Sequence, residues 1–215
     1  MTATTALTAQ NTLGVRGVHP IPSSFVRQQI EACIEDVGVD VVKTGMLAGA
    51  ETIEMLADVI RTRSIPAVVV DPVMVSTSGA ELLERGAIDT LITSLLPLVT
   101  LLTPNIPEAN LILSRRGGEE VEIQSVADLE TMARRIQALG PRWVLVKGGH
   151  RPFAKDLAST GNEVVVDVLV GPGEGEVVRV ESPWQDSTST HGTGCTLACE
   201  SGSNHCFGNE EKSAC

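Results

Sequence analysis

The sequence of 215 residues lacks several features that would place it in common classes of protein. No apolar run approaches the roughly 18 residues of a membrane-spanning helix. The first residues, MTATTALTAQNTLG, have neither the basic nor the apolar segment of a signal peptide. Basic residues are the minority: 16 Lys and Arg stand against 27 Asp and Glu, for a net charge of -11. This balance argues against a nucleic acid or an anionic membrane as the main partner.

A secreted disulfide framework is also missing. The chain has five cysteines, an odd number, and four of them lie in its last 21 residues, within HGTGCTLACESGSNHCFGNEEKSAC (191–215). The same stretch spaces its histidines and cysteines as H-x₃-C-x₃-C-x₅-H-C, without the paired CxxC of a structural zinc site. The sequence therefore indicates a soluble protein of a reducing compartment, and we predict the cytoplasm.

Strands and helices alternate along the chain. Continuous β-branched apolar runs, typical of strands buried on both faces, occupy 39–47, 67–73, 99–105 and 143–149. Amphipathic patterns between them predict helices at 23–37, 51–63, 81–95, 107–114 and 125–139, the last ending at Gly140-Pro141. EVVVDVLV, GPGEGE and VVRVES predict an antiparallel hairpin near 163–181. This order favours a single α/β domain with a mostly parallel central sheet flanked by helices.

The predicted strands end in polar or charged groups beside Gly or Pro. These endings are KTGM (43–46), DPVM (71–74), TPN (103–105) with Glu108 following, and KGGH (147–150). Ligands of open α/β sheets bind beyond the carboxyl ends of the strands. Four such endings predict a shared ligand cleft.

Each ending also has a purely structural interpretation. Asp71 and Glu108 have the oxygen ligands that Mg²⁺ takes beside phosphates, but Asp before Pro and Glu in a first helical turn are also common turn and cap residues. Lys147 could meet a phosphate or be a solvated surface lysine. The glycines of HGTGCT (191–196) could form an anion pocket at a helix start or an ordinary turn.

Seven motifs stand in one order along the chain: TALTAQNT (5–12), GVHP (17–20), VKTGML (42–47), DPVMVSTSG (71–79), TPNIPEA (103–109), VKGGH (146–150) and HGTGCTL (191–197). Over about residues 3–198 the chain closely resembles the hydroxymethylpyrimidine/phosphomethylpyrimidine kinases of thiamine biosynthesis, in the ribokinase-like superfamily. The resemblance implies a ribokinase-like fold with ATP as phosphate donor and Mg²⁺ as cofactor. It also implies small-molecule substrates, 4-amino-5-hydroxymethyl-2-methylpyrimidine and its monophosphate, and leaves a homo-oligomer open.

The resemblance assigns roles by position. Gln10 matches the glutamine that hydrogen-bonds the aminopyrimidine, and Met46 and Val73 match the apolar walls of its pocket. From the residues alone, a Met in an apolar stretch is more often part of the core. Asn105 and Glu108 match the NxxE pair that organises Mg²⁺ and the nucleotide phosphates.

The remaining matches concern the transferred phosphate. Lys147 matches the lysine near the phosphates, and Gly192, Thr193 and Gly194 match the anion hole. Cys195 stands where these kinases carry cysteine and many relatives carry an aspartate base. A thiol at a helix N-terminus can have a depressed pKa, so a thiolate accepting the hydroxymethyl proton is chemically reasonable. The structural alternative is a small, inert core residue.

The chain departs from the family pattern at both ends. Family members carry a strand and a GxDxSGGAGIQADLKTF-like segment before TALTAQNT, so we expect the first strand–helix unit to be missing. After residue 198 the Ala-rich helix of the family gives way to a polar sequence. We therefore predict an incomplete kinase domain over 1–198 and a disordered, non-family tail over 199–215, with the C-terminal helices missing.

Two other functions remain open at this point. The first is a pyridoxal or pyridoxamine kinase of the same superfamily, against which Cys195 and the AQNT segment count. The second is a non-catalytic truncated form that binds ligand weakly or pairs with a longer partner. The leading prediction remains the pyrimidine kinase, with activity possibly lost through truncation.

Overall fold

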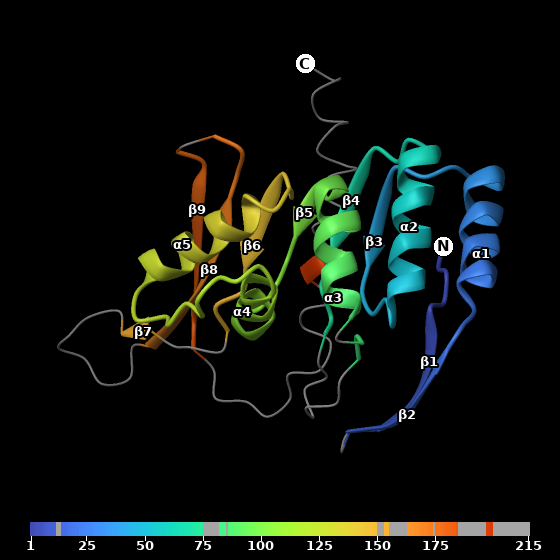
Figure 1. Cartoon of the computed structure of the whole chain (residues 1–215). Coiled ribbons are helices and arrows are strands. Elements are labelled where there is room, and N and C mark those ends of the chain that lie inside the picture. Colours follow the sequence, from blue (N-terminus) through green and yellow to red (C-terminus); the bar gives the residue numbers. More distant parts are fainter. Residues whose placement is uncertain are drawn as a thin grey trace.

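The computed structural model describes residues 1–11, 14–74, 82–84, 86–149, 153–154, 163–173, 175–184 and 197–199. A seven-stranded mixed sheet lies at its centre, in the order β3-β4-β5-β6-β8-β7 with β9 paired to β8 (Figure 1). The strands of this sheet are β3 Val41–Thr44, β4 Ala67–Val70, β5 Leu101–Leu102, β6 Trp143–Val146, β7 Phe153–Ala154, β8 Glu163–Val170 and β9 Val177–Pro183. Strands β3 to β6 are parallel, and β8 joins β6 in the antiparallel sense.

The predicted fold class is confirmed, since the four apolar runs form the parallel strands and the hairpin near 163–181 forms β8 and β9. The hairpin extends the central sheet and makes it mixed. Strand β4 is buried along its whole length, as its unbroken apolar run predicts. A short run buried on both faces thus gave a correct strand prediction here.

Helices precede and connect the parallel strands and pack side by side in chain order, each against the next (Figure 1). They are α1 Ser23–Asp36, α2 Ala50–Thr62, α3 Ala87–Thr90, α4 Ile106–Arg115 and α5 Val126–Gln137. Their apolar faces and the sheet form one core, which includes the fully buried Ile53, Leu102, Ile112 and Leu129. The core therefore joins elements from all along the described chain.

The helix predicted at 81–95 differs from the structure. Residues 82–84 are not helical, and α3 continues as a π-helical turn, Leu91–Leu95, and a 3₁₀ turn, Leu96–Leu98. Pro97 lies in this last turn, and the α-carbon of Gly140 packs so closely on it that a side chain at Gly140 would overlap it. Tertiary contacts thus shape a segment that periodicity alone described as one helix.

A two-stranded antiparallel ribbon precedes α1 and was not predicted. It consists of β1 Ala6–Asn11 and β2 Gly14–Pro20, with a register shift between Ala9 and Gln10. The ribbon belongs to no larger sheet and extends beyond α1 and α2 in Figure 1. Its residues are mostly exposed, because it packs on little else.

Candidate functional site

The carboxyl ends of three neighbouring parallel strands bring charged and polar side chains together. Asp71 follows β4, Thr103 follows β5 and Lys147 follows β6. The Lys147 ammonium donates to Asp71 Oδ1 at 2.8 Å, and the Thr103 hydroxyl lies 3.3 Å from the same oxygen. We call these three residues, with Asn105 and Glu108, the strand-end cluster.

The lysine of this cluster is not a solvated surface lysine, so that interpretation is wrong. Only 17% of the Lys147 side chain is exposed, and only 4% of its partner Asp71. The Lys147 backbone N–H donates to Pro104 O at 2.9 Å, which ties the end of β6 to the end of β5. A buried ion pair costs desolvation and is retained only with good geometry and further hydrogen bonds, which Thr103 supplies here.

Helix α4 begins at this same edge of the sheet. Asn105 caps it: its side chain accepts from the Glu108 backbone N–H at 2.9 Å, while the Glu108 carboxylate accepts from the Asn105 backbone N–H at 2.9 Å. The cap interpretation of Glu108 is therefore correct. The two residues also place the positive end of the helix dipole beside the cluster.

Glu108 is buried, and its burial raises the pKa of its carboxyl group from the ordinary 4.5 to about 7. The Asn105 backbone N–H and the Lys147 ammonium lower this pKa, while the nearby Asp71 carboxylate raises it. Two carboxyl groups thus share a poorly solvated space with one ammonium. With both carboxyl groups ionised, this space carries a net negative charge, which a further cation would neutralise.

The donors of this space fit Mg²⁺. That ion commonly takes one or two carboxylates and completes its shell with water and substrate phosphates. Within the described ranges no group of three or more His, Cys, Asp or Glu side chains is arranged to hold a metal. Asp71 and Glu108 would therefore need oxygen ligands from a bound nucleotide.

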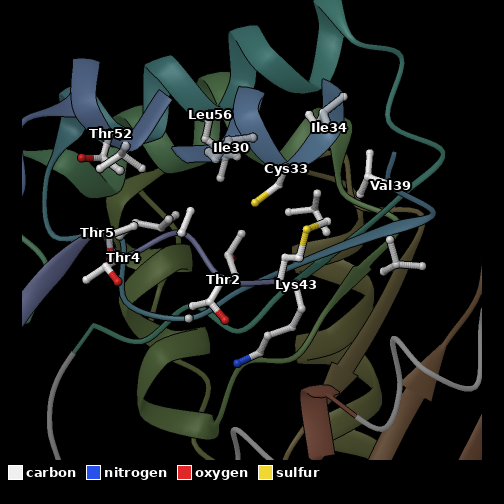
Figure 2. A pocket seen from close by; sticks show the side chains of 18 of the residues that line it. Thr2, Thr4, Thr5, Ile30, Cys33, Ile34, Val39, Lys43, Thr52 and Leu56 are labelled. Atoms are coloured by element: carbon white, nitrogen blue, oxygen red, sulfur yellow. The ribbon is translucent and has the colours of Figure 1, made fainter. Parts of the chain in front are cut away.

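A cavity of about 860 Å³ lies between α1, β3 and residues 1–6. Figure 2 shows Ile30 and Cys33 of α1 on one side of it and Lys43 of β3 on another. Met46 lines this cavity, and its carbonyl accepts from the Thr5 hydroxyl at 2.7 Å. The cavity reaches the end of β3 but is not lined by the strand-end cluster itself.

The three predicted pyrimidine contacts lie in different settings. Met46 and Val73 are half-buried beyond the ends of β3 and β4, and Val73 closely follows Asp71 of the strand-end cluster in the chain. Gln10 is exposed on the ribbon, at its register shift, and is not part of that cluster. The structure therefore groups two of the three with the strand ends.

The predicted anion hole and base, Gly192, Thr193, Gly194 and Cys195, lie outside the described residues. So does the predicted tail 199–215, apart from its first residue, Cys199, and the domain boundary at 198 stays a prediction. No helix in the described part of the chain is long and apolar enough to cross a membrane.

Sequence reasoning missed two polar residues of this region. Thr103 is fully buried against Asp71, although in the sequence it is only the first residue of the strand ending TPN. Asp167 lies in β8, where its carboxylate accepts from the Gly148 backbone N–H at 2.8 Å. A single carboxylate inside the apolar run EVVVDVLV was the signal that could have pointed to it.

A mixed sheet flanked by helices, with polar residues at the strand ends, is the architecture that this chain shares with solved kinases of the ribokinase-like class. A solved Bacillus subtilis pyridoxal kinase in complex with ADP superposes with a TM-score of 0.74 at 31% identity, over 95% of this chain and 70% of that one. The phosphomethylpyrimidine kinase of Clostridium difficile gives a TM-score of 0.68 at 35% identity, over 93% and 78%.

The chain belongs to the phosphomethylpyrimidine kinase family, whose model matches residues 1–214. The thiamine biosynthesis bifunctional protein ThiED of Geobacter sulfurreducens is 45% identical over 197 residues, which are 90% of this chain and 36% of that protein. The chain spans about a third of the bifunctional relatives and about two thirds of several single-function ones.

Proposed function

We propose that this chain carries the catalytic domain of a kinase that transfers the γ-phosphoryl group of ATP to 4-amino-5-hydroxymethyl-2-methylpyrimidine and to its monophosphate. The observation that carries the proposal is the buried Lys147, held on Asp71 at the strand ends beside the capped start of α4. Relatives about 40% identical are named hydroxymethylpyrimidine/phosphomethylpyrimidine kinases.

The nucleotide phosphates are proposed to bind at the strand-end cluster. Transfer of a phosphoryl group depends mainly on positioning and on stabilising the charge of its oxygens. Lys147 offers an ammonium held by Asp71 on a backbone that is itself bonded to Pro104 O, and the N-terminus of α4 at Asn105 adds a positive dipole end. Asp71 and Glu108 would hold Mg²⁺, which neutralises phosphate charge when bound.

The acceptor is proposed to bind between the strand ends and the ribbon. Met46 and Val73 offer apolar contacts to the ring, and Gln10 offers an amide to its amino group. The hydroxymethyl oxygen forms the new bond to the γ-phosphorus as the bond to the bridging oxygen of ADP breaks. Cys195 is proposed to accept the hydroxyl proton, with Gly192, Thr193 and Gly194 binding the transferred phosphoryl group.

The proposal is tested by a phosphorylation assay. Purified protein is incubated with ATP, Mg²⁺ and hydroxymethylpyrimidine, and the mono- and diphosphate are measured by mass spectrometry. We expect both products, and we expect Lys147→Ala to lose at least about a hundredfold in kcat/KM. Folded wild-type protein that makes neither product would overturn the proposal and favour a non-catalytic form.

Pyridoxal is the second candidate acceptor, because several solved relatives at 26–31% identity are pyridoxal kinases. The same assay with pyridoxal separates the two. We expect a higher kcat/KM for the pyrimidine, because the relatives with higher identity carry the pyrimidine name. Cytoplasmic localisation stays a prediction, since plant relatives are named chloroplastic.

A further inference from the structure

Asp167 is a carboxylate in the middle of the apolar part of β8, with valine or leucine at positions 164–166 and 168–170. Its neighbours in β8, Val166 and Val168, are buried in the core, and Asp167 itself is half-buried. Burial raises the pKa of its carboxyl group. A half-buried carboxylate lowers the stability of the fold unless its contacts compensate for the lost hydration, so the contacts of Asp167 indicate its role.

The register of the sheet puts Asp167 beside Lys147. Strands β6 and β8 pair Val144 with Val170 and Val146 with Val168. One further step along this antiparallel register sets Lys147 opposite Asp167, and directly opposed residues present their side chains on the same face. The Lys147 ammonium accordingly lowers the pKa of Asp167, although burial outweighs it.

The contact that Asp167 makes is with the backbone that follows the lysine. Its Oδ1 accepts from the Gly148 N–H at 2.8 Å. Gly148 also packs so closely on β8 that an added Cβ would overlap the Val166 carbonyl. The end of β6 is therefore clamped at Gly148 by β8, from the side opposite to β5.

Lys147 is thus fixed at three points. Its own N–H donates to Pro104 O at 2.9 Å, its ammonium donates to Asp71 Oδ1 at 2.8 Å, and the next N–H along the chain donates to Asp167. Removal of the Asp167 carboxylate would leave the Gly148 N–H without this acceptor and free the backbone beyond Lys147 to rotate. The ammonium would then be held only through Asp71 and the Pro104 contact, and its position would be less well fixed.

We propose that Asp167 is a positioning residue for Lys147: by holding the Gly148 N–H it keeps the lysine ammonium at the strand ends, where the nucleotide phosphates bind. The placement of the ammonium follows from the contacts of the chain itself. That nucleotide phosphates bind at the strand ends rests on the proposed function. The hydrogen bond needs an acceptor at position 167, and an amide oxygen can serve as one.

Three variants on β8 separate this role from a general effect on stability. Asp167→Ala removes the acceptor, Asp167→Asn keeps an acceptor without the charge, and Glu163→Ala changes an exposed carboxylate on the same strand. If Asp167→Ala does not fold, Asp167→Val replaces it, since a β-branched residue suits a strand and also lacks the acceptor.

The first measurement needs no substrate. The rate of acetylation of Lys147 by acetic anhydride is followed by peptide mass spectrometry on the folded full chain. We expect about a fivefold faster rate in Asp167→Ala, from the loss of one buried hydrogen bond. Asp167→Asn and Glu163→Ala should stay within about twofold of the wild type.

The second measurement uses the kinase assay. Asp167→Ala should raise the KM for ATP about tenfold and leave the KM for the pyrimidine unchanged, with Asp167→Asn restoring most of the loss. In a Lys147→Ala background, Asp167→Ala should add no further loss of kcat/KM, because both changes act through one ammonium.

The outcomes separate the two proposals. An unchanged acetylation rate of Lys147 in folded Asp167→Ala or Asp167→Val overturns the positioning role, whatever the activity. The wild-type protein could phosphorylate nothing while Asp167→Ala still raises the acetylation rate of Lys147. That result supports the positioning role and overturns the proposed function. Equal shifts in both KM values would show that Asp167 acts on the whole fold and would also overturn the role.

Discussion

The strand-end cluster and the β1–β2 ribbon both carry residues assigned to the site, yet they are built in opposite ways. In the cluster, Asp71 and Lys147 are buried, paired at 2.8 Å and supported by Thr103. On the ribbon, Gln10 is exposed, and the apolar Leu7 of the same strand is 56% exposed. One region is fixed by its own contacts, and the other has few contacts to fix it.

The difference follows from the burial of charge in the cluster and the lack of packing around the ribbon. Buried charges are costly unless they are paired, so the cluster exists only in a well-defined geometry. A two-stranded ribbon is marginal by itself in water and depends on its attachments. Here one such attachment is the Thr5 hydroxyl, which donates to Met46 O. We therefore expect phosphate-binding groups to be in place before ligand binds, and Gln10 to be ordered by the ligand.

The largest predicted effect is on the buried pair. Lys147→Ala leaves the Asp71 carboxylate buried without its ammonium, and should lower the free energy of unfolding by about 3–5 kcal/mol in urea titrations. Lys43→Ala, a lysine of β3 outside the cluster, is the control. A loss below about 1 kcal/mol, typical of surface pairs, would show that the cluster is no more fixed than the ribbon.

The pH dependence of stability probes the same region through Glu108. Its pKa is about 7 in the folded chain against an ordinary 4.5, so the folded state binds more protons between these values. The free energy of unfolding should therefore fall as pH rises from 4.5 to 7, by about 3 kcal/mol from this residue.

Glu108→Gln removes that ionisation, so its stability should fall less over the same pH range. Urea titrations at several pH values measure the difference, and Glu163→Gln, an exposed carboxylate on β8, is the control. Parallel curves for wild type and Glu108→Gln would contradict the burial argument.

Close packing at the end of β6 gives the third prediction. Gly148→Ala would drive a Cβ into the Val166 carbonyl, which is backbone and yields little, and should cost about 2 kcal/mol. The adjacent Gly149→Ala enters open space and should change stability by less than about 0.5 kcal/mol. Thermal unfolding compares the two, and equal effects would refute the clamp on this strand.

The ribbon should show the smallest effect on stability. Gln10→Ala changes an exposed residue, so the free energy of unfolding should stay within about 0.5 kcal/mol of the wild type. Under the proposed function, the KM for the pyrimidine should nevertheless rise about tenfold through the lost hydrogen bond. A clear loss of stability together with an unchanged KM would reverse the contrast between the two regions.

Periodicity located most of the fold because buried strands and amphipathic helices leave strong signals. The runs around β4 and β6, and the helix stop at Gly140, were read correctly for this reason. The single helix predicted at 81–95 was wrong, because helix α3 and the turns after it are shaped by contacts such as that of Pro97 with Gly140. The ribbon left no core signal, since it faces solvent.

By itself, the sequence determined which residue types end the strands and hence at which edge of the sheet a ligand cleft is predicted. Asp71, Asn105, Glu108 and Lys147 were all found in this way. Only the tertiary structure decided that Lys147 is a buried partner of Asp71 and that Asp167 holds the backbone behind it. These contacts join residues 76 and 19 positions apart in the chain. Pattern along a chain cannot specify them, because they depend on the order and register of strands in the sheet.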